Sequence, residues 1–174
     1  MSRGTQATPE ASLTDASPTS RDRVLDIVGL IARVTLGTIF IVAGALKVGQ
    51  PLVSARAVQA YDVLPFELAG LVGQALPYLE IILGTLLVLG LFTRFCAATL
   101  SVLLVFFIAG IAQAWARGLA IDCGCFGGGG AIAPGETEYP QRIAEDLGML
   151  ALGAYLTWRP RSLASLDRRL FGAG

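Results

Sequence analysis

Three stretches of the chain are long and apolar enough to cross a lipid bilayer as helices. Residues 27–46 carry a single charge, Arg33, over twenty residues, and twenty helical residues extend about 30 Å, the thickness of a hydrocarbon core. Residues 68–92 form a second stretch, interrupted by Pro77 and Glu80, and residues 95–116 form a third, which carries no charge. These stretches predict an all-α integral membrane protein rather than a soluble domain.

A fourth span is predicted over residues 143–158, although its signal is weaker. Its uncharged part begins only at Leu147, and the whole segment covers roughly 24 Å, so a surface or re-entrant helix is the alternative. A span is favoured because Glu145 and Asp146 would lie in its first turn at headgroup level, where helix N-termini favour anions. Trp158 would mark the far interface. The predicted fold is therefore a four-helix membrane bundle over residues 24–158, with helices at about 27–46, 68–92, 95–116 and 143–158.

The composition excludes several classes of function. The chain is 54% hydrophobic and 15% charged, and its 13 acidic and 13 basic side chains cancel. No single-sign field is available to hold nucleic acid, so the predicted partner is membrane lipid and not DNA or RNA. Histidine is absent, which removes the usual general base and the commonest zinc and copper ligand. We therefore predict no metal site.

The two ends of the chain predict its orientation. Residues 1–23 are rich in Ser, Thr, Pro and Ala and predict a disordered tail, and residues 159–174 form a basic tail. With four spans, the side of the termini holds eight basic residues and the other side holds four, namely Lys47, Arg56, Arg117 and Arg142. This bias predicts a multi-pass protein of the plasma membrane with both termini in the cytoplasm and an exported loop over residues 117–142. A signal peptide cleaved near Ala43-Gly44-Ala45 is the alternative, but the apolar stretch is long for one and contains Arg33.

The strongest local motif is a cysteine pair in that loop. Cys123 and Cys125 flank Gly124, and a run of glycines follows Phe126. Residues at i and i+2 meet the Cα separation of a disulfide only in a bent backbone, which the intervening glycine makes accessible. A strained, exposed disulfide of this kind is exchangeable rather than structural. We therefore predict that Cys123 and Cys125 are the catalytic residues of thiol–disulfide exchange. An inert structural pair and a Cu(I) or zinc thiolate site remain as alternatives, although two sulfurs without histidine make an incomplete metal shell.

Charges near the pair act in opposite directions on its thiols. Asp122 opposes thiolate formation, whereas Arg117, Arg142 and Lys47 favour it if they gather at the same membrane face. Cys96 lies at the other end of the third predicted helix, roughly 30 Å away. We predict that Cys96 is a small buried apolar residue that does not exchange with the pair.

Two helices carry charges on faces that also carry small residues. In the first helix the shared face comprises Arg33, Gly37, Phe40, Gly44 and Lys47, and in the second it comprises Pro77, Glu80, Gly84, Leu87 and Leu91. Glycines on such faces let helices approach closely. Intramembrane charges face the bundle interior or a partner, so Arg33 and Glu80 are the predicted pair. The alternatives are that Arg33 extends to the headgroups and that Glu80 stays protonated.

These motifs together resemble the DoxX-like membrane proteins, and more specifically their MauE (methylamine utilization) branch. The resemblance rests on the two helix patterns above and on the segment from Asp122 to Gly127, and it covers about residues 24–158. It implies a four-helix membrane protein associated with redox chemistry. MauE members are linked to maturation of methylamine dehydrogenase, whose small subunit needs many disulfides, and they act alongside a thioredoxin-like protein. The substrate does not transfer with the fold.

The functional hypothesis is a membrane redox protein in which Cys123 and Cys125 exchange thiols and disulfide with an exported thioredoxin-like partner. A lipid quinone or another membrane partner, held near Arg33 and Glu80 as cofactor-binding residues, would take up or supply the electrons. A non-catalytic scaffold subunit that docks a redox partner is the alternative, and a small transporter using Glu80 is a weaker one. The sequence leaves open the substrate, the direction of electron flow, the cysteine attacked first and the oligomeric state.

Overall fold

The computed structural model describes residues 20–122, 129–133 and 137–159, which form five helices and one short β-hairpin. The helices are α1 (Ser20–Val48), α2 (Pro51–Ala60), α3 (Phe66–Leu89), α4 (Thr93–Ala116) and α5 (Tyr139–Trp158). The hairpin pairs β1 (Ile121–Asp122) with β2 (Gly130–Ala131) in antiparallel register. The predicted disordered tail up to residue 19 and the basic tail from residue 160 lie outside the described residues.

The predicted count of four helices is not confirmed, because α2 adds a fifth within a segment expected to be a loop. Pro51 lies in the first turn of α2, a position that suits its fixed φ and its missing N–H. Helix α1 begins at Ser20, inside the segment predicted as tail, and Asp22 in its first turn complements the helix dipole. Helix α3 ends at Leu89 rather than at residue 92. Gly90 caps it in the left-handed conformation at φ 71°, which glycine adopts without a Cβ penalty.

Three of the helices, α1, α3 and α4, are long and apolar enough to cross a membrane. Helix α5 is not among them. It begins four residues earlier than predicted, and its first two turns hold the ion pairs of Arg142 with Glu138 and Glu145. A fourth span at α5 therefore stays a prediction.

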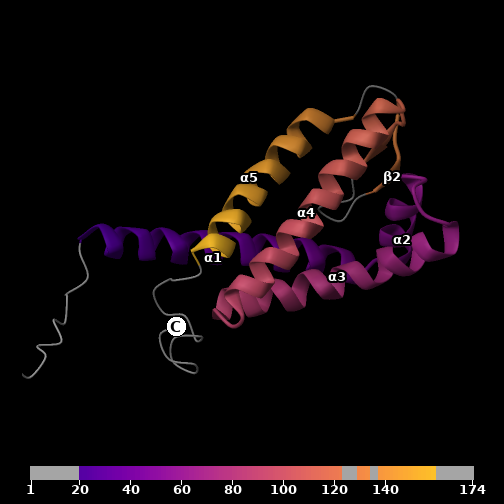
Figure 1. The fold of residues 1–174 in the computed structure, drawn as a ribbon. Helices are drawn as coiled ribbons and strands as arrows, with labels where there is room; N and C mark the ends of the chain where they lie inside the picture. Colours follow the sequence, from indigo (N-terminus) through magenta and orange to yellow (C-terminus); the bar gives the residue numbers. More distant parts are fainter. Residues whose placement is uncertain (1–19, 123–128, 134–136, 160–174) are drawn as a thin grey trace, which may run out of the picture.

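The helices are arranged as two antiparallel pairs that cross obliquely (Figure 1). Helix α3 runs back along α1, and α5 runs back along α4. The short turn after Leu89 joins the pairs, and α3 and α4 diverge from it. Helix α2 packs on α3 at the diverging end. The bundle is therefore closed at the turn and held open at the other end, where the hairpin also lies.

Glycines make the closest contacts between α1 and α3, as the sequence predicted. A Cβ on Gly37 would lie 2.6 Å from Val88 Cγ2 and 2.8 Å from Gly84 O. A Cβ on Gly44 would lie 2.6 Å from Pro77 O. Real Cβ atoms do not approach other atoms this closely, so these positions require glycine. The contacts also set the register, which places Gly44 opposite Pro77 and Gly37 opposite Gly84.

A leucine-rich core closes the bundle near the turn. Its fully buried members come from all four long helices and include Leu36, Leu87, Leu100 and Leu156. Cys96 belongs to this core and its thiol is completely buried. The prediction that Cys96 is a buried apolar residue is confirmed.

A larger side chain at Gly84 should separate α1 from α3. We expect Gly84→Leu to lower the free energy of unfolding by about 1–3 kcal/mol, because overpacked helix contacts force backbone shifts. Denaturation of the purified protein in mixed detergent micelles measures this change.

Gly148→Leu is the matched control, since an added Cβ at Gly148 meets no atom within 4 Å. It should leave the unfolding midpoint close to wild type. Equal loss of stability in both variants would contradict the close approach of α1 and α3.

Candidate functional site

The predicted catalytic residues, Cys123 and Cys125, lie outside the described residues, but the structure describes the segments on either side of them. Asp122 pairs with Gly130 in the hairpin, so the two strands bring the ends of the segment 123–129 together. Ile132 N also donates to Ala120 O at 2.9 Å. This hydrogen bond extends the pairing beyond the strands, on the side away from the cysteines. The residues that flank the cysteine segment are therefore joined by a short β-ladder.

Tyr139 at the start of α5 fastens this ladder to the helices. Its hydroxyl accepts a hydrogen bond from Ile121 N at 3.2 Å and donates one to Leu119 O. The ring is buried with Ile111, Ala114 and Ile121. The base of the cysteine loop is thus fixed to α4 and α5 at the end of the bundle away from Ser20 and Arg159.

Three basic side chains near this end, those of Arg117, Arg142 and Lys47, are paired with carboxylates. Arg117 Nη2 lies 2.9 Å from Asp62 Oδ2, and Arg142 contacts Glu138 and Glu145. Lys47 also has a carboxylate partner, which is described next. Their charges are therefore compensated locally, and this weakens the predicted effect of Arg117, Arg142 and Lys47 on the thiols.

A buried ion pair between Lys47 and Glu80 joins α1 to α3. Lys47 Nζ donates to both carboxylate oxygens of Glu80, at 2.7 and 2.8 Å. The two side chains are 7% and 1% exposed. Lys47 lies in the last turn of α1, where the helix dipole also favours a cation. Glu80 therefore has a partner, which is one of the two alternatives that the sequence left open, but the partner is Lys47.

The predicted pairing of Arg33 with Glu80 is wrong, because the two residues lie at different levels of the bundle. Arg33 precedes Lys47 by fourteen positions, or about 21 Å along α1. The register of α1 against α3 places it near the C-terminal end of α3, and it is 2% exposed. A cation there complements the carbonyl end of that helix. The role of Arg33 in cofactor binding stays a prediction, and it does not share a site with Glu80.

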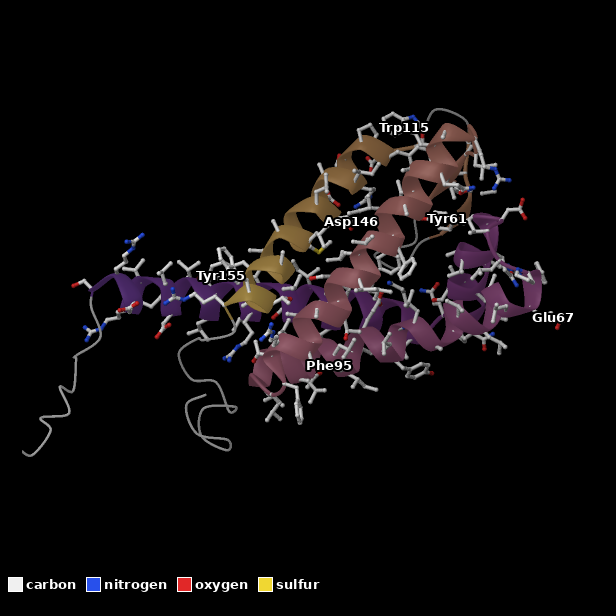
Figure 2. All side chains as sticks on the ribbon, in the orientation of Figure 1. Tyr61, Glu67, Phe95, Trp115, Asp146 and Tyr155 are labelled. Atoms are coloured by element: carbon white, nitrogen blue, oxygen red, sulfur yellow. The ribbon has the colours of Figure 1, made fainter. Side chains whose placement is uncertain are left out.

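Asp146 belongs to the same buried charged cluster as Lys47 and Glu80, and the sequence did not predict its burial. It was expected at the membrane surface, but it is 3% exposed and lies between α5 and the neighbouring helices (Figure 2). With Lys47 and Glu80 it lines a small cavity of about 20 Å³. Its Oδ2 makes no hydrogen bond to the part of the chain that the structure describes. The sequence feature that could have predicted its burial is its helical spacing to Gly153 and Leu156, which are also buried in α5.

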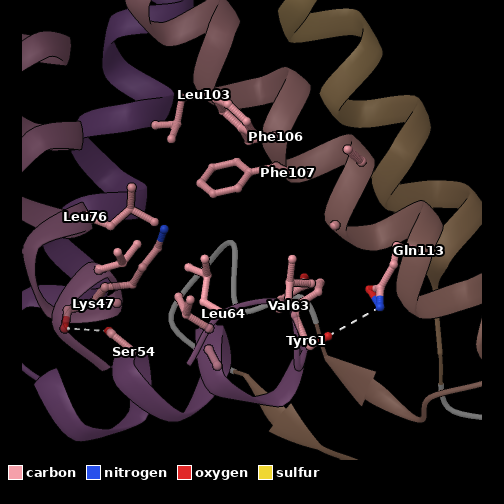
Figure 3. Close-up of a pocket in the computed structure, with 16 residues that line it drawn as sticks. Lys47, Ser54, Tyr61, Val63, Leu64, Leu76, Leu103, Phe106, Phe107 and Gln113 are labelled. Atoms are coloured by element: carbon pink, nitrogen blue, oxygen red, sulfur yellow. Dashed lines mark hydrogen bonds between the residues drawn. The ribbon is translucent and has the colours of Figure 1, made fainter. Parts of the chain in front are cut away.

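A much larger pocket of about 630 Å³ lies on the other side of Lys47, between the diverging helices (Figure 3). Its walls are mostly apolar and come from α2, the segment between α2 and α3, α3 and α4. Lys47 and Phe107 line both this pocket and the small cavity. Lys47 Nζ lies 6.0 Å from the centre of the Phe107 ring, within range of a cation–π contact. The buried ion pair therefore forms part of the wall between the two spaces.

The pocket also reaches the base of the cysteine loop through Tyr61. Tyr61 lines the pocket, and it packs against the buried cluster of Ile111, Ile121 and Tyr139. Gln113 Nε2 donates to Tyr61 O at 3.4 Å. One side chain therefore belongs both to the pocket and to the packing that holds the hairpin.

The family model described as methylamine utilisation protein MauE matches residues 25–159. The chain belongs to this family. The match begins within α1 and ends just after α5, so it includes every helix and the cysteine loop. MauE membership and the three apolar helices fit a membrane protein, and the family is one associated with methylamine utilisation. No curated protein and no solved structure matches the chain.

The Lys47–Glu80 pair yields a prediction about stability. Lys47→Met and Glu80→Leu should each lower the free energy of unfolding by roughly 3 kcal/mol, because each leaves one buried charge without its partner. The double variant should recover most of this loss, since two apolar side chains replace a pair whose burial is itself costly. A double-mutant cycle of detergent denaturation measures the coupling.

Asp62→Asn, which breaks the exposed pair with Arg117, is the matched control and should change stability by less than about 1 kcal/mol. Additive losses in the Lys47 and Glu80 cycle would show that the two side chains do not interact.

Proposed function

We propose that this MauE family member is a membrane redox protein that exchanges thiols and disulfide through Cys123 and Cys125 with an exported thioredoxin-like protein. The observation that carries the proposal is the anchoring of the cysteine loop. Paired strands hold its two ends, and Tyr139 fixes those strands to a bundle with three membrane-spanning candidates. The strands on either side of the Cys-Gly-Cys segment therefore lie at one end of the helical bundle, which is where a soluble partner would approach.

The exchange needs only the two sulfurs and the partner's disulfide. In one direction, a thiolate of the pair attacks the disulfide of the partner and forms a mixed disulfide, and a partner thiolate leaves. The second thiol of the pair then displaces the remaining partner sulfur. The products are a Cys123–Cys125 disulfide and a reduced partner, and the reverse sequence oxidises the partner. Two electrons and two protons move in either direction.

The proposed location is the plasma membrane, with both termini in the cytoplasm and the loop outside. The excess of basic residues beside the termini supports this orientation. The exported compartment is also the one in which disulfides persist. Maturation of methylamine dehydrogenase, or of other exported proteins that need disulfides, is the proposed role because the family is associated with methylamine utilisation.

Trapping experiments test the exchange. In membranes, a mass-tagged maleimide should label Cys123 and Cys125 only after reduction in one fraction of the protein and without reduction in another. Cys123→Ser or Cys125→Ser should accumulate a mixed disulfide with the partner, because the resolving thiol is gone. Mass spectrometry of the trapped species identifies the attached protein.

Cys96→Ala is the control, because Cys96 is buried in the leucine core and should contribute nothing to trapping. The double variant Cys123→Ser/Cys125→Ser separates the exchange from a scaffold role. A scaffold would retain its partner and its activity in that variant, whereas an exchanger loses turnover. A pair that is always reduced, or never reducible, also contradicts the proposal.

A further inference from the structure

The 630 Å³ pocket has the properties of a binding site for a small lipid-soluble molecule. Its volume falls within the roughly 300–1,000 Å³ of ligand sites, which are mostly apolar with a few polar groups. It reaches the molecular surface between α3 and α4, where Val72 is 38% and Phe106 is 68% exposed. Both helices are membrane-spanning candidates. A ligand would therefore enter from the lipid, and a long hydrophobic tail would leave by the same opening.

The ammonium of Lys47 gives the pocket its main hydrogen-bond donor. An ammonium has three N–H donors, and Glu80 accepts two of them. No acceptor for the third is found within the described ranges. Because the Lys47–Glu80 pair is neutral as a whole, an anionic ligand beside Lys47 would also face the Glu80 carboxylate. The site therefore favours a neutral molecule with a hydrogen-bond acceptor, such as a carbonyl oxygen.

Gln113 supplies a second polar group at the opposite end of the pocket from Lys47 (Figure 3). Its amide nitrogen is engaged with Tyr61 O, but its buried Oε1 has no hydrogen-bond partner among the residues that the structure covers. Phe107, which lies beside Lys47, precedes Gln113 by about 9 Å along α4. The space between a donor at one end and an acceptor at the other fits one flat ring that carries an oxygen at each end.

We propose that this pocket binds the ring of a lipid quinone, with Lys47 donating a hydrogen bond to one ring oxygen and Gln113 lying at the other. Phe107 and Tyr61 supply the aromatic walls. Gln113 Oε1 accepts a hydrogen bond from the hydroxyl of the reduced form, the quinol. The site lies beside Glu80, one of the two residues predicted to bind a cofactor, and far from the other, Arg33.

The redox role of the quinone rests on the proposed function. A reduced Cys123–Cys125 pair and a quinone give a disulfide and a quinol, and two electrons and two protons pass from the sulfurs to the ring oxygens. This reaction balances without another reactant, and it runs in reverse when a quinol supplies the electrons. Binding of the quinone is independent of the cysteines and is tested separately.

The test measures binding of decylubiquinone to the purified full chain in lipid nanodiscs by equilibrium dialysis. Ala109 lines the pocket, and Val105 lies one turn earlier on α4 outside the pocket lining. Ala109→Trp should weaken binding at least tenfold by filling the space, whereas Val105→Trp should leave it within about twofold. Both substitutions add the same side chain to the same helix, so their difference reports the pocket.

Two further probes test the polar part of the site. Decylbenzene has the tail and a ring without oxygens, and decanoate has an anionic head. The wild type should prefer decylubiquinone to both. In the double variant Lys47→Met/Glu80→Leu, which avoids an unpaired buried charge, decylubiquinone should bind about tenfold more weakly, because a hydrogen bond to a charged donor is lost. Binding of decylbenzene should not change.

Three outcomes would overturn the binding of a quinone in this pocket. Equal binding of decylubiquinone and decylbenzene would make the pocket a site for lipid tails only, and tighter binding of decanoate would make it a site for an anionic lipid. Unchanged binding in Ala109→Trp would place the quinone elsewhere. The assays are repeated with Cys123→Ser/Cys125→Ser, in which binding should persist. Binding without electron transfer in either direction between the bound ring and the Cys123–Cys125 pair would contradict the redox role of the quinone and leave both the binding site and the exchange with the soluble partner intact.

Discussion

The buried contact between Lys47 and Glu80 determines how the rest of the membrane domain is organised. It joins the last turn of α1 to the middle of α3, with the ammonium held by both carboxylate oxygens. Two opposite charges are tolerated in an apolar bundle only when they meet with good geometry, so the contact selects one register of α1 against α3. The glycine contacts at Gly37 and Gly44 agree with that register. Charge pairing and close packing therefore specify the same arrangement.

The same pair connects the two internal spaces of the protein. On one side it adjoins the small cavity that contains Asp146, and on the other it forms the end of the large pocket. The pocket exists because α3 and α4 diverge from the turn at Gly90, while the leucine core holds the helices together only near that turn. Helix α2 fills part of the opening and contributes Ser54, Ala57 and Val58 to the lining.

The sequence predicted the membrane-spanning candidates and the helix faces, because both depend on local patterns of hydropathy and spacing. The face from Arg33 to Lys47 is buried at all five predicted positions. The partner of Glu80 was not predictable in the same way, since it depends on the register between two antiparallel helices. That register depends on contacts between residues far apart in the sequence, and the connection over residues 49–65 contains α2, which is too short to be recognised from hydropathy. Asp146 was missed because its position was judged from the polar start of α5 and not from the side of the helix that packs on α4.

Tyr61 belongs both to the lining of the large pocket and to the packing beneath the hairpin. It therefore connects the pocket with the strands that flank the cysteines. Its ring borders the pocket and supports the hairpin packing, and its carbonyl accepts hydrogen bonds from Gln113 and Arg117 of α4. A molecule that displaces this ring also disturbs the side-chain packing that supports the strands on either side of the cysteines. By thermodynamic reciprocity, a partner that reshapes those strands alters the affinity of the pocket by the same factor. Under the proposed function, docking of the soluble partner and binding of the lipid-soluble ligand would therefore be coupled through Tyr61.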